Sequence, residues 1–206
     1  QFVSGTHALA TVLFGILRPG DELVSLTGAP YDTMQTVIGY ANPSKGSLRE
    51  FGILYDELPM REGKVDMAGI AGKIKPETKM VLIQRSRGYS MRSPLTIEDI
   101  CAICTEVKRV KPDCVCFVDN CYGEFVDLQE PVQAGADIMA GSLIKNPGGG
   151  LAPTGGYIVG YIPMVALAGF LMSKSDKWWL HLLAMVAGEV VLYLIGTVWF
   201  CVQAGK

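Results

Sequence analysis

The sequence lacks any stripe or cluster of basic residues. Its 18 lysines and arginines are scattered among 20 acidic residues, and the formal net charge at pH 7 is −2. Proteins that bind the backbone of nucleic acid need a concentrated positive surface, because that backbone is densely negative. We therefore expect no nucleic-acid partner for this chain.

A cleavable signal sequence is also missing from the amino end. Such a signal would direct the chain to an oxidising compartment, where cysteines pair as disulfides. We therefore expect a cytoplasmic location for residues 1–156 and reduced thiols at Cys101, Cys104, Cys114, Cys116, Cys121 and Cys201. A zinc site built from the first four is the alternative, but two of them fall within a helical pattern and two within a strand. We expect no metal site.

Residues 1–156 alternate between short apolar runs and helical patterns. The runs predict strands over 22–26, 53–58, 80–84, 115–119 and 138–140, and helices are predicted over 6–17, 33–38, 66–74 and 97–110. Because the strand runs show little alternation of polar and apolar residues, they predict a mostly parallel sheet covered on both faces. The predicted fold class is α/β, with a ligand crevice beyond the carboxyl ends of the strands.

Asp119 and Lys145 carry the clearest chemical signal. Asp119 ends the apolar run that begins at Val115, and Lys145 follows Ser142 by three positions, just before a run of glycines. Pyridoxal phosphate needs a lysine amine that binds its aldehyde and a carboxylate that keeps its ring nitrogen protonated. The pair therefore predicts a pyridoxal-phosphate site, with Lys145 as the catalytic lysine and Ser142 beside it on the phosphate.

Three further segments suit the same cofactor. Ser4 to Ala8 opens a helix, whose amino end attracts phosphate, and the amides of Gly5 and Thr6 would bind it; an ordinary helix cap is the alternative. Tyr31 is expected to stack on the ring or reach the phosphate, with simple core packing as the alternative. Residues 85–89 follow a buried strand, and they are expected either at the edge of the crevice or in a solvated loop.

Five motifs resemble the methionine gamma-lyase family, also called the aluminium resistance protein. They are Ser4 to Ala8, Gly28 to Thr33, Arg85 to Arg92, Phe117 to Glu124 and Gly141 to Gly150. That family is similar to the cystathionine-metabolism enzymes of the type I pyridoxal-phosphate fold. The resemblance, which covers about residues 1 to 160, implies that residues 1–156 form part of the large domain of that fold.

The resemblance also implies a reaction, which is elimination on a sulfur-containing amino acid with breakage of a carbon–sulfur bond. Lys145 would carry the cofactor and shuttle the proton, Asp119 would pair with the ring nitrogen, and Tyr31 would lie against the ring. Ser142 and the amides at the start of the first helix would hold the phosphate.

Members of that family carry a segment before the Ser4 motif and a small carboxy-terminal domain, and they form homo-oligomers. The chain begins at Gln1 and shows neither part. The comparison predicts a truncated lyase with an incomplete active site, which puts its activity in doubt.

Residues 157–206 have the composition of a membrane protein. Residues 157–172 and 178–202 are apolar, and a polar link joins them. About 20 apolar residues are enough to cross a bilayer, and tryptophans near both ends of the second stretch suit the interfaces. We expect two apolar helices in the plasma membrane, most clearly over 178–202. Glu189 weighs against a lipid-facing position, and two buried helices of a soluble protein are the alternative.

This tail resembles the biotin-binding membrane subunit of energy-coupling-factor vitamin transporters. The motifs are Pro153 to Pro163, Lys177 to Trp179 and Tyr193 to Phe200. The residues implied to contact biotin are Thr154, Gly155, Gly156 and Tyr157. Residues 153–157 fit both families, so three interpretations stay open: a lyase fragment, a fragment of a biotin transporter, and a non-functional chimera of the two.

Overall fold

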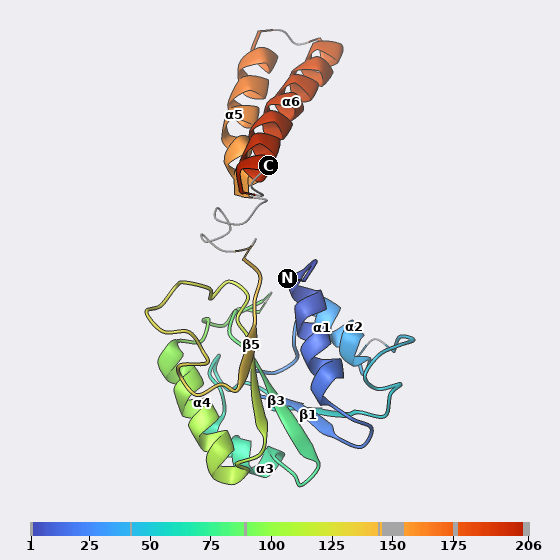
Figure 1. Ribbon diagram of the computed structural model, residues 1–206, viewed down its shortest axis with the longest axis vertical. Helices are drawn as coiled ribbons and strands as arrows, with labels where there is room; N and C mark the ends of the chain where they lie inside the picture. Colours follow the sequence, from blue (N-terminus) through green and yellow to red (C-terminus); the bar gives the residue numbers. More distant parts are fainter. Residues whose placement is uncertain are drawn as a thin grey trace. The chain divides into compact units, whose positions relative to one another are not determined.

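The structure is a computed structural model that describes residues 2–41, 43–88, 90–143, 145, 155–174 and 177–203. The chain divides into two compact units, Gln1–Ser142 and Leu143–Lys206. The first unit contains a sheet with helices, and the second contains a pair of helices (Figure 1).

One sheet of five strands forms the centre of the first unit. The strands are β1 (Glu22–Ser25), β2 (Leu54–Glu57), β3 (Thr78–Gln84), β4 (Val115–Asp119) and β5 (Ile138–Ala140), in the spatial order β2-β1-β3-β4-β5. Every neighbouring pair is parallel. The predicted α/β class with a parallel sheet is confirmed, and β4 and β5 have the predicted bounds.

Helices cover both faces of this sheet (Figure 1). The helices α1 (Gly5–Ile16) and α2 (Asp32–Ile38) pack on one face, and α3 (Ile70–Lys73) and α4 (Ile97–Val110) pack on the other. Successive strand residues point to opposite faces, so Phe117 packs with α1 and α2. Its neighbours Cys116 and Val118 pack with α3 and α4. The three central strands, β1, β3 and β4, are almost entirely buried, which explains the apolar runs of β3 and β4, whereas the edge strands β2 and β5 are partly exposed.

The helix predicted over residues 66–74 is the clearest error in this unit. The structure has a 3-10 turn, η1 (Met67–Gly69), followed by the single helical turn of α3. The side chain of Asp66 accepts a hydrogen bond from the backbone N–H of Gly69 at 3.2 Å and so stabilises the tighter turn. Gly69 and Gly72 also lower the helix propensity of the segment, which explains why a longer helix does not form.

The second unit is a hairpin of α5 (Gly155–Met172) and α6 (Trp178–Gln203). Two glycines allow close contact between these helices. A Cβ atom added at Gly160 would lie 3.2 Å from the carbonyl oxygen of Leu192, and one added at Gly188 would lie 3.1 Å from that of Met164. The hairpin is therefore packed backbone to backbone at these two positions.

Within the described residues, one helix is long and apolar enough to cross a membrane, whereas we predicted two. It covers Trp178–Trp199, 22 residues with a mean hydropathy of 1.9. The apolar stretch of α5 among the described residues, Val159–Met172, is shorter, and it contains Pro163. Within the described residues, the second membrane span is therefore not confirmed.

Candidate functional site

Asp119 lies where the carboxyl ends of three strands meet. It is the last residue of β4, and it pairs in register with Gln84 of β3 and Ala140 of β5. Asp119 is 3% exposed, and its Oδ1 accepts a hydrogen bond from the backbone N–H of Cys121 at 3.1 Å. This edge of a doubly covered parallel sheet is where such folds bind ligands.

The amino end of α1 reaches the same edge. Ser4 caps the helix by accepting a hydrogen bond from the backbone N–H of His7 at 3.1 Å. A Cβ atom added at Gly5 would lie 3.2 Å from Cβ of Ser142 and 3.4 Å from Sγ of Cys121. Gly5 therefore packs against the residues that follow β5 and β4, and the positive end of the α1 dipole lies beside them.

Tyr31 joins this group from the start of α2. Its hydroxyl lies 3.1 Å from Oγ1 of Thr6, and its backbone N–H donates a hydrogen bond to Oε1 of Gln84 at 3.1 Å. Burial raises the pKa of the Tyr31 phenol, and the hydrogen bond with Thr6 lowers it. The nearby Asp119 and Cys121 raise this pKa further. The phenol therefore keeps its proton at neutral pH.

The structure thus brings together five predicted site residues of the first unit, Gly5, Thr6, Tyr31, Asp119 and Ser142. The group combines a buried acid, a phenol and the amino end of a helix. Such a set suits a ligand with a basic nitrogen at one end and an anionic group at the other.

The other predicted site residues belong to the second unit or lie outside the description. Lys145 is exposed. Thr154 lies outside the described residues, and Gly155, Gly156 and Tyr157 begin α5. Their predicted roles rest on the sequence alone.

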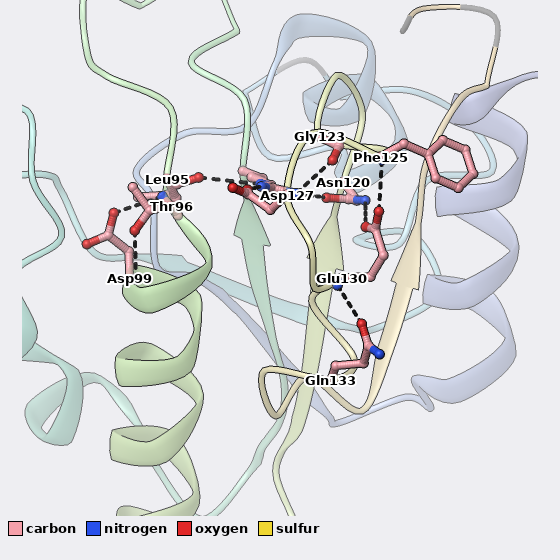
Figure 2. A network of polar contacts seen from close by, with 10 residues as sticks. Leu95, Thr96, Asp99, Asn120, Gly123, Phe125, Asp127, Glu130 and Gln133 are labelled. Atoms are coloured by element: carbon pink, nitrogen blue, oxygen red, sulfur yellow. Dashed lines mark hydrogen bonds and ion pairs between the residues drawn. The ribbon is translucent and has the colours of Figure 1, made fainter. Parts of the chain in front are cut away.

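Arg85 belongs to a buried network, so the solvated-loop alternative is wrong for this residue. It is 4% exposed, and its guanidinium donates hydrogen bonds to Oδ1 of Asn120 at 2.9 Å and to the carbonyl oxygen of Gly123 at 2.8 Å. Glu130 accepts hydrogen bonds from Nδ2 of Asn120 and from the backbone N–H of Phe125, both at 2.8 Å (Figure 2). The network fixes the loop that follows β4.

Two residues at this edge were missed by the sequence analysis. The thiol of Cys121 lies close to Gly5, and Glu124 accepts a hydrogen bond from the backbone N–H of Ser142. Both follow Asp119 within five residues. The sequence offers two signals for them: they follow a strand that ends in an acid, and they lie within the motif Phe117 to Glu124.

All six cysteines are free thiols. Four are buried, whereas Cys101 is exposed and Cys201 is half-buried. A hydrogen bond between Cys104 and Cys116 lowers the pKa of Cys104 and raises that of Cys116. In the part of the chain that the structure describes, three or more candidate metal ligands nowhere come together.

Comparison with known proteins identifies a family. The family model described as methionine gamma-lyase matches residues 1–175, and so extends past residue 156 into α5. A Bacillus subtilis protein, YnbB, whose own description is "uncharacterized", is 48% identical over 176 residues, which are 84% of this chain and 42% of that protein.

Two solved structures extend the comparison to the fold. A candidate cystathionine beta-lyase involved in aluminium resistance, from Listeria monocytogenes, is 57% identical with a TM-score of 0.70, over 73% of this chain and 37% of that chain. A carbon–sulfur lyase involved in aluminium resistance, from Clostridium novyi, is 37% identical with a TM-score of 0.66. The match covers 96% of this chain and 48% of that chain. This chain therefore spans less than half the length of these three relatives. Because the family model covers most of its residues, the chain belongs to the methionine gamma-lyase family.

Proposed function

We propose that this chain is part of a pyridoxal-phosphate-dependent lyase that breaks a carbon–sulfur bond in a sulfur-containing amino acid. The observation that carries the proposal is the buried carboxylate of Asp119, which lies beside Tyr31 and the amino end of α1 at the carboxyl ends of the strands. Membership of the methionine gamma-lyase family supports the class of reaction.

The residues of the first unit fit pyridoxal phosphate. A buried carboxylate such as that of Asp119 favours the protonated form of a ring nitrogen, because opposite charges interact strongly away from water. The amino end of α1 and the hydroxyl of Ser142 suit a phosphate, and Gly5 brings backbone amides to it without a side chain. Tyr31 offers an aromatic face or a hydroxyl to the ring.

Different residues of the chain would have different roles in this reaction. When bound, the cofactor stores the electron pair left on the substrate after a proton is removed. Lys145 would hold the aldehyde and move that proton, as an amine freed from its covalent bond can act as a base. Asp119 would keep the ring nitrogen charged, and Ser142 with the amides at the start of α1 would hold the phosphate.

The choice of substrate and the assembly into oligomers are properties of a whole protein. The chain spans 37% to 48% of the three relatives, so the choice of sulfur amino acid and the formation of a homo-oligomer are proposals about more than the described residues. We propose that residues 1–156 supply the cofactor-binding part of that protein in the cytoplasm.

Absorbance spectroscopy tests the cofactor proposal. The chain loaded with pyridoxal phosphate and freed of excess should keep a visible absorption band that Lys145→Ala lacks, because the band requires a covalent bond to this amine. The matched control Lys64→Ala removes an exposed lysine and should keep the band. Release of a thiol, a 2-oxo acid and ammonia from a sulfur amino acid and water would extend the result to lyase activity. A wild-type chain without the band contradicts the proposal.

We also propose that α6 spans a membrane. The helix contains the 22-residue apolar run Trp178–Trp199, which has tryptophans at both ends. Only 22% of the most apolar part of this run is buried. Expressed in cells, the chain should stay with membranes through an alkaline carbonate wash and should need detergent for release. Release into the wash would favour the alternative, a helix covered by protein.

Biotin binding stays a prediction from the resemblance of the tail. The family and the relatives reported above do not support the transporter alternative. The family match covers residues 1–175 and therefore includes the predicted junction at residues 153–157.

A further inference from the structure

Glu124 is a buried carboxylate that the proposed function does not use. It is 7% exposed, and its Oε1 accepts a hydrogen bond from the backbone N–H of Ser142. Glu124 belongs to the loop after β4, and Ser142 follows the neighbouring strand β5. The contact therefore ties together the segments that leave two adjacent strands.

Gly141 makes room for this contact. A Cβ atom added at Gly141 would lie 2.5 Å from Oε1 of Glu124 and 3.1 Å from its Cδ. A side chain at this position would push the carboxylate away from the amide of Ser142. Ser142 is also tightly packed against the start of α1, since a Cβ atom added at Gly5 would lie 3.2 Å from the Cβ atom of Ser142.

The loop that carries Glu124 is itself held in place. Both neighbours of Glu124 are bonded: the carbonyl oxygen of Gly123 accepts from Arg85, and the N–H of Phe125 donates to Glu130 (Figure 2). Phe125 has a φ of 59°, a left-handed conformation that costs free energy for a non-glycine residue. A conformation of this kind persists only where surrounding contacts impose it. The contacts of Gly123 and Phe125 therefore hold the backbone on both sides of Glu124 in place.

We infer that Glu124 is a positioning residue for the phosphate end of the proposed cofactor site. It fixes the amide of Ser142, and Ser142 in turn lies against Gly5 at the amino end of α1. Glu124 acts through Ser142 and does not need to touch the cofactor. The inference rests on the proposed function, and it gives a physical cause for the position of Ser142 within it.

Binding measurements on the full 206-residue chain test this inference. Dissociation constants for pyridoxal phosphate and for pyridoxal, which lacks the phosphate, are compared in the wild type, Glu124→Ala, Glu124→Gln and the control Glu77→Ala, which removes an exposed carboxylate just before β3. Loss of the acceptor in Glu124→Ala should weaken pyridoxal phosphate by about tenfold and leave pyridoxal unchanged. Glu124→Gln keeps an acceptor oxygen and should stay within about threefold of the wild type, and Glu77→Ala should match the wild type.

Gly141→Ala is a second, independent variant, because it keeps the carboxylate but crowds it. It should cause the same phosphate-specific loss, and it should add little to Glu124→Ala, since the atoms that it meets are then gone. Hydrogen exchange at the amide of Ser142 should be faster in Glu124→Ala and in Gly141→Ala than in the wild type, and it should be near normal in Glu124→Gln.

Each outcome decides between two claims. Equal weakening of pyridoxal phosphate and pyridoxal, or unchanged binding in both Glu124→Ala and Gly141→Ala, would overturn the role of Glu124 while leaving the cofactor site in place. A wild-type chain that binds neither compound would reject the proposed function, and the role of Glu124 with it. If Glu124→Ala does not fold, Gly141→Ala and Glu124→Gln carry the comparison.

Discussion

Asp119 is the residue on which the proposed chemistry depends most. It is 3% exposed, and the backbone N–H of Cys121 donates a hydrogen bond to its Oδ1 at 3.1 Å. Water screens a charge in such a position only weakly, so the carboxylate interacts strongly with a cation placed beside it. The same carboxylate lies near Tyr31 and helps to raise the pKa of its phenol, after burial, which raises this pKa most.

Asp119→Asn should weaken the binding of pyridoxal phosphate by about 10- to 100-fold, since it removes the charge of a charge-assisted hydrogen bond. The new amide oxygen can still accept from Cys121, so the free energy of unfolding should change little. Titration by visible absorbance measures the affinity, and urea unfolding checks the fold. The control Asp113→Asn removes an exposed carboxylate, and equal affinity in both variants would contradict the role of Asp119.

Tyr55 controls part of the response to alkaline pH. Its hydroxyl donates a hydrogen bond to Oε2 of Glu57 at 2.8 Å. Burial raises the pKa of the Tyr55 phenol, and the contact with Glu57 raises it further. The folded state therefore holds this proton more tightly than the unfolded chain, in which tyrosine titrates near pH 10. The resulting stability is complete below about pH 10 and is lost as the pH rises toward the pKa of the folded state.

The wild type should accordingly lose more unfolding free energy than Tyr55→Phe between about pH 9 and pH 11. Urea unfolding at several pH values measures the difference. Met91→Leu, at a fully exposed side chain that does not titrate, serves as the control and should follow the wild type. If Tyr55→Phe shows the wild-type dependence on pH, Tyr55 does not contribute as described.

Among the elements, α4 shows when sequence alone is enough. Its predicted bounds, Ile97–Val110, are those of the structure, because several local signals agree. The side chain of Thr96 accepts from the N–H of Asp99 at 3.2 Å, and Asp99 accepts from the N–H of Thr96 at 2.9 Å, which forms a capping box. Apolar residues at helical spacing then face the sheet.

Thr96→Ala should lower the free energy of unfolding by about 1 kcal/mol, because it leaves an amide at the start of α4 without its cap. Urea unfolding followed by circular dichroism measures the change. Thr105→Ala, at an exposed position within the same helix, should be neutral or slightly stabilising, since alanine favours helix. Equal effects of the two substitutions would contradict the importance of the cap.

Other elements depend on contacts that leave no local pattern. The segment 66–74 has apolar residues at helical spacing, but the capped turn at Asp66 and its glycines shorten the helix. The role of Arg85 depends on Asn120 and Gly123, more than 30 residues away. At the site, the motif around Asp119 was visible in the sequence. The contact between Glu124 and Ser142 was not, because Ser142 follows a different strand.

At the scale of the whole molecule, the chain joins an α/β unit to a helical hairpin and spans less than half of the three relatives. The parallel sheet of the first unit followed from the repeated order of strand and helix, since parallel neighbours need such crossovers, whereas its strand order was not predicted. Whether the second unit lies in a membrane or in a protein core could not be predicted from the sequence. The same apolar helix suits a bilayer or a larger protein core, and composition does not separate the two.

Covalent mapping of pyridoxal phosphate tests whether Lys145 is the residue that binds the cofactor. The chain is loaded with the cofactor, treated with borohydride to make the bond to the amine permanent, digested, and examined by mass spectrometry. We expect one modified peptide, the one that contains Lys145, with less modification in Asp119→Asn. Modification spread over exposed lysines such as Lys64, or an unmodified Lys145, would contradict it.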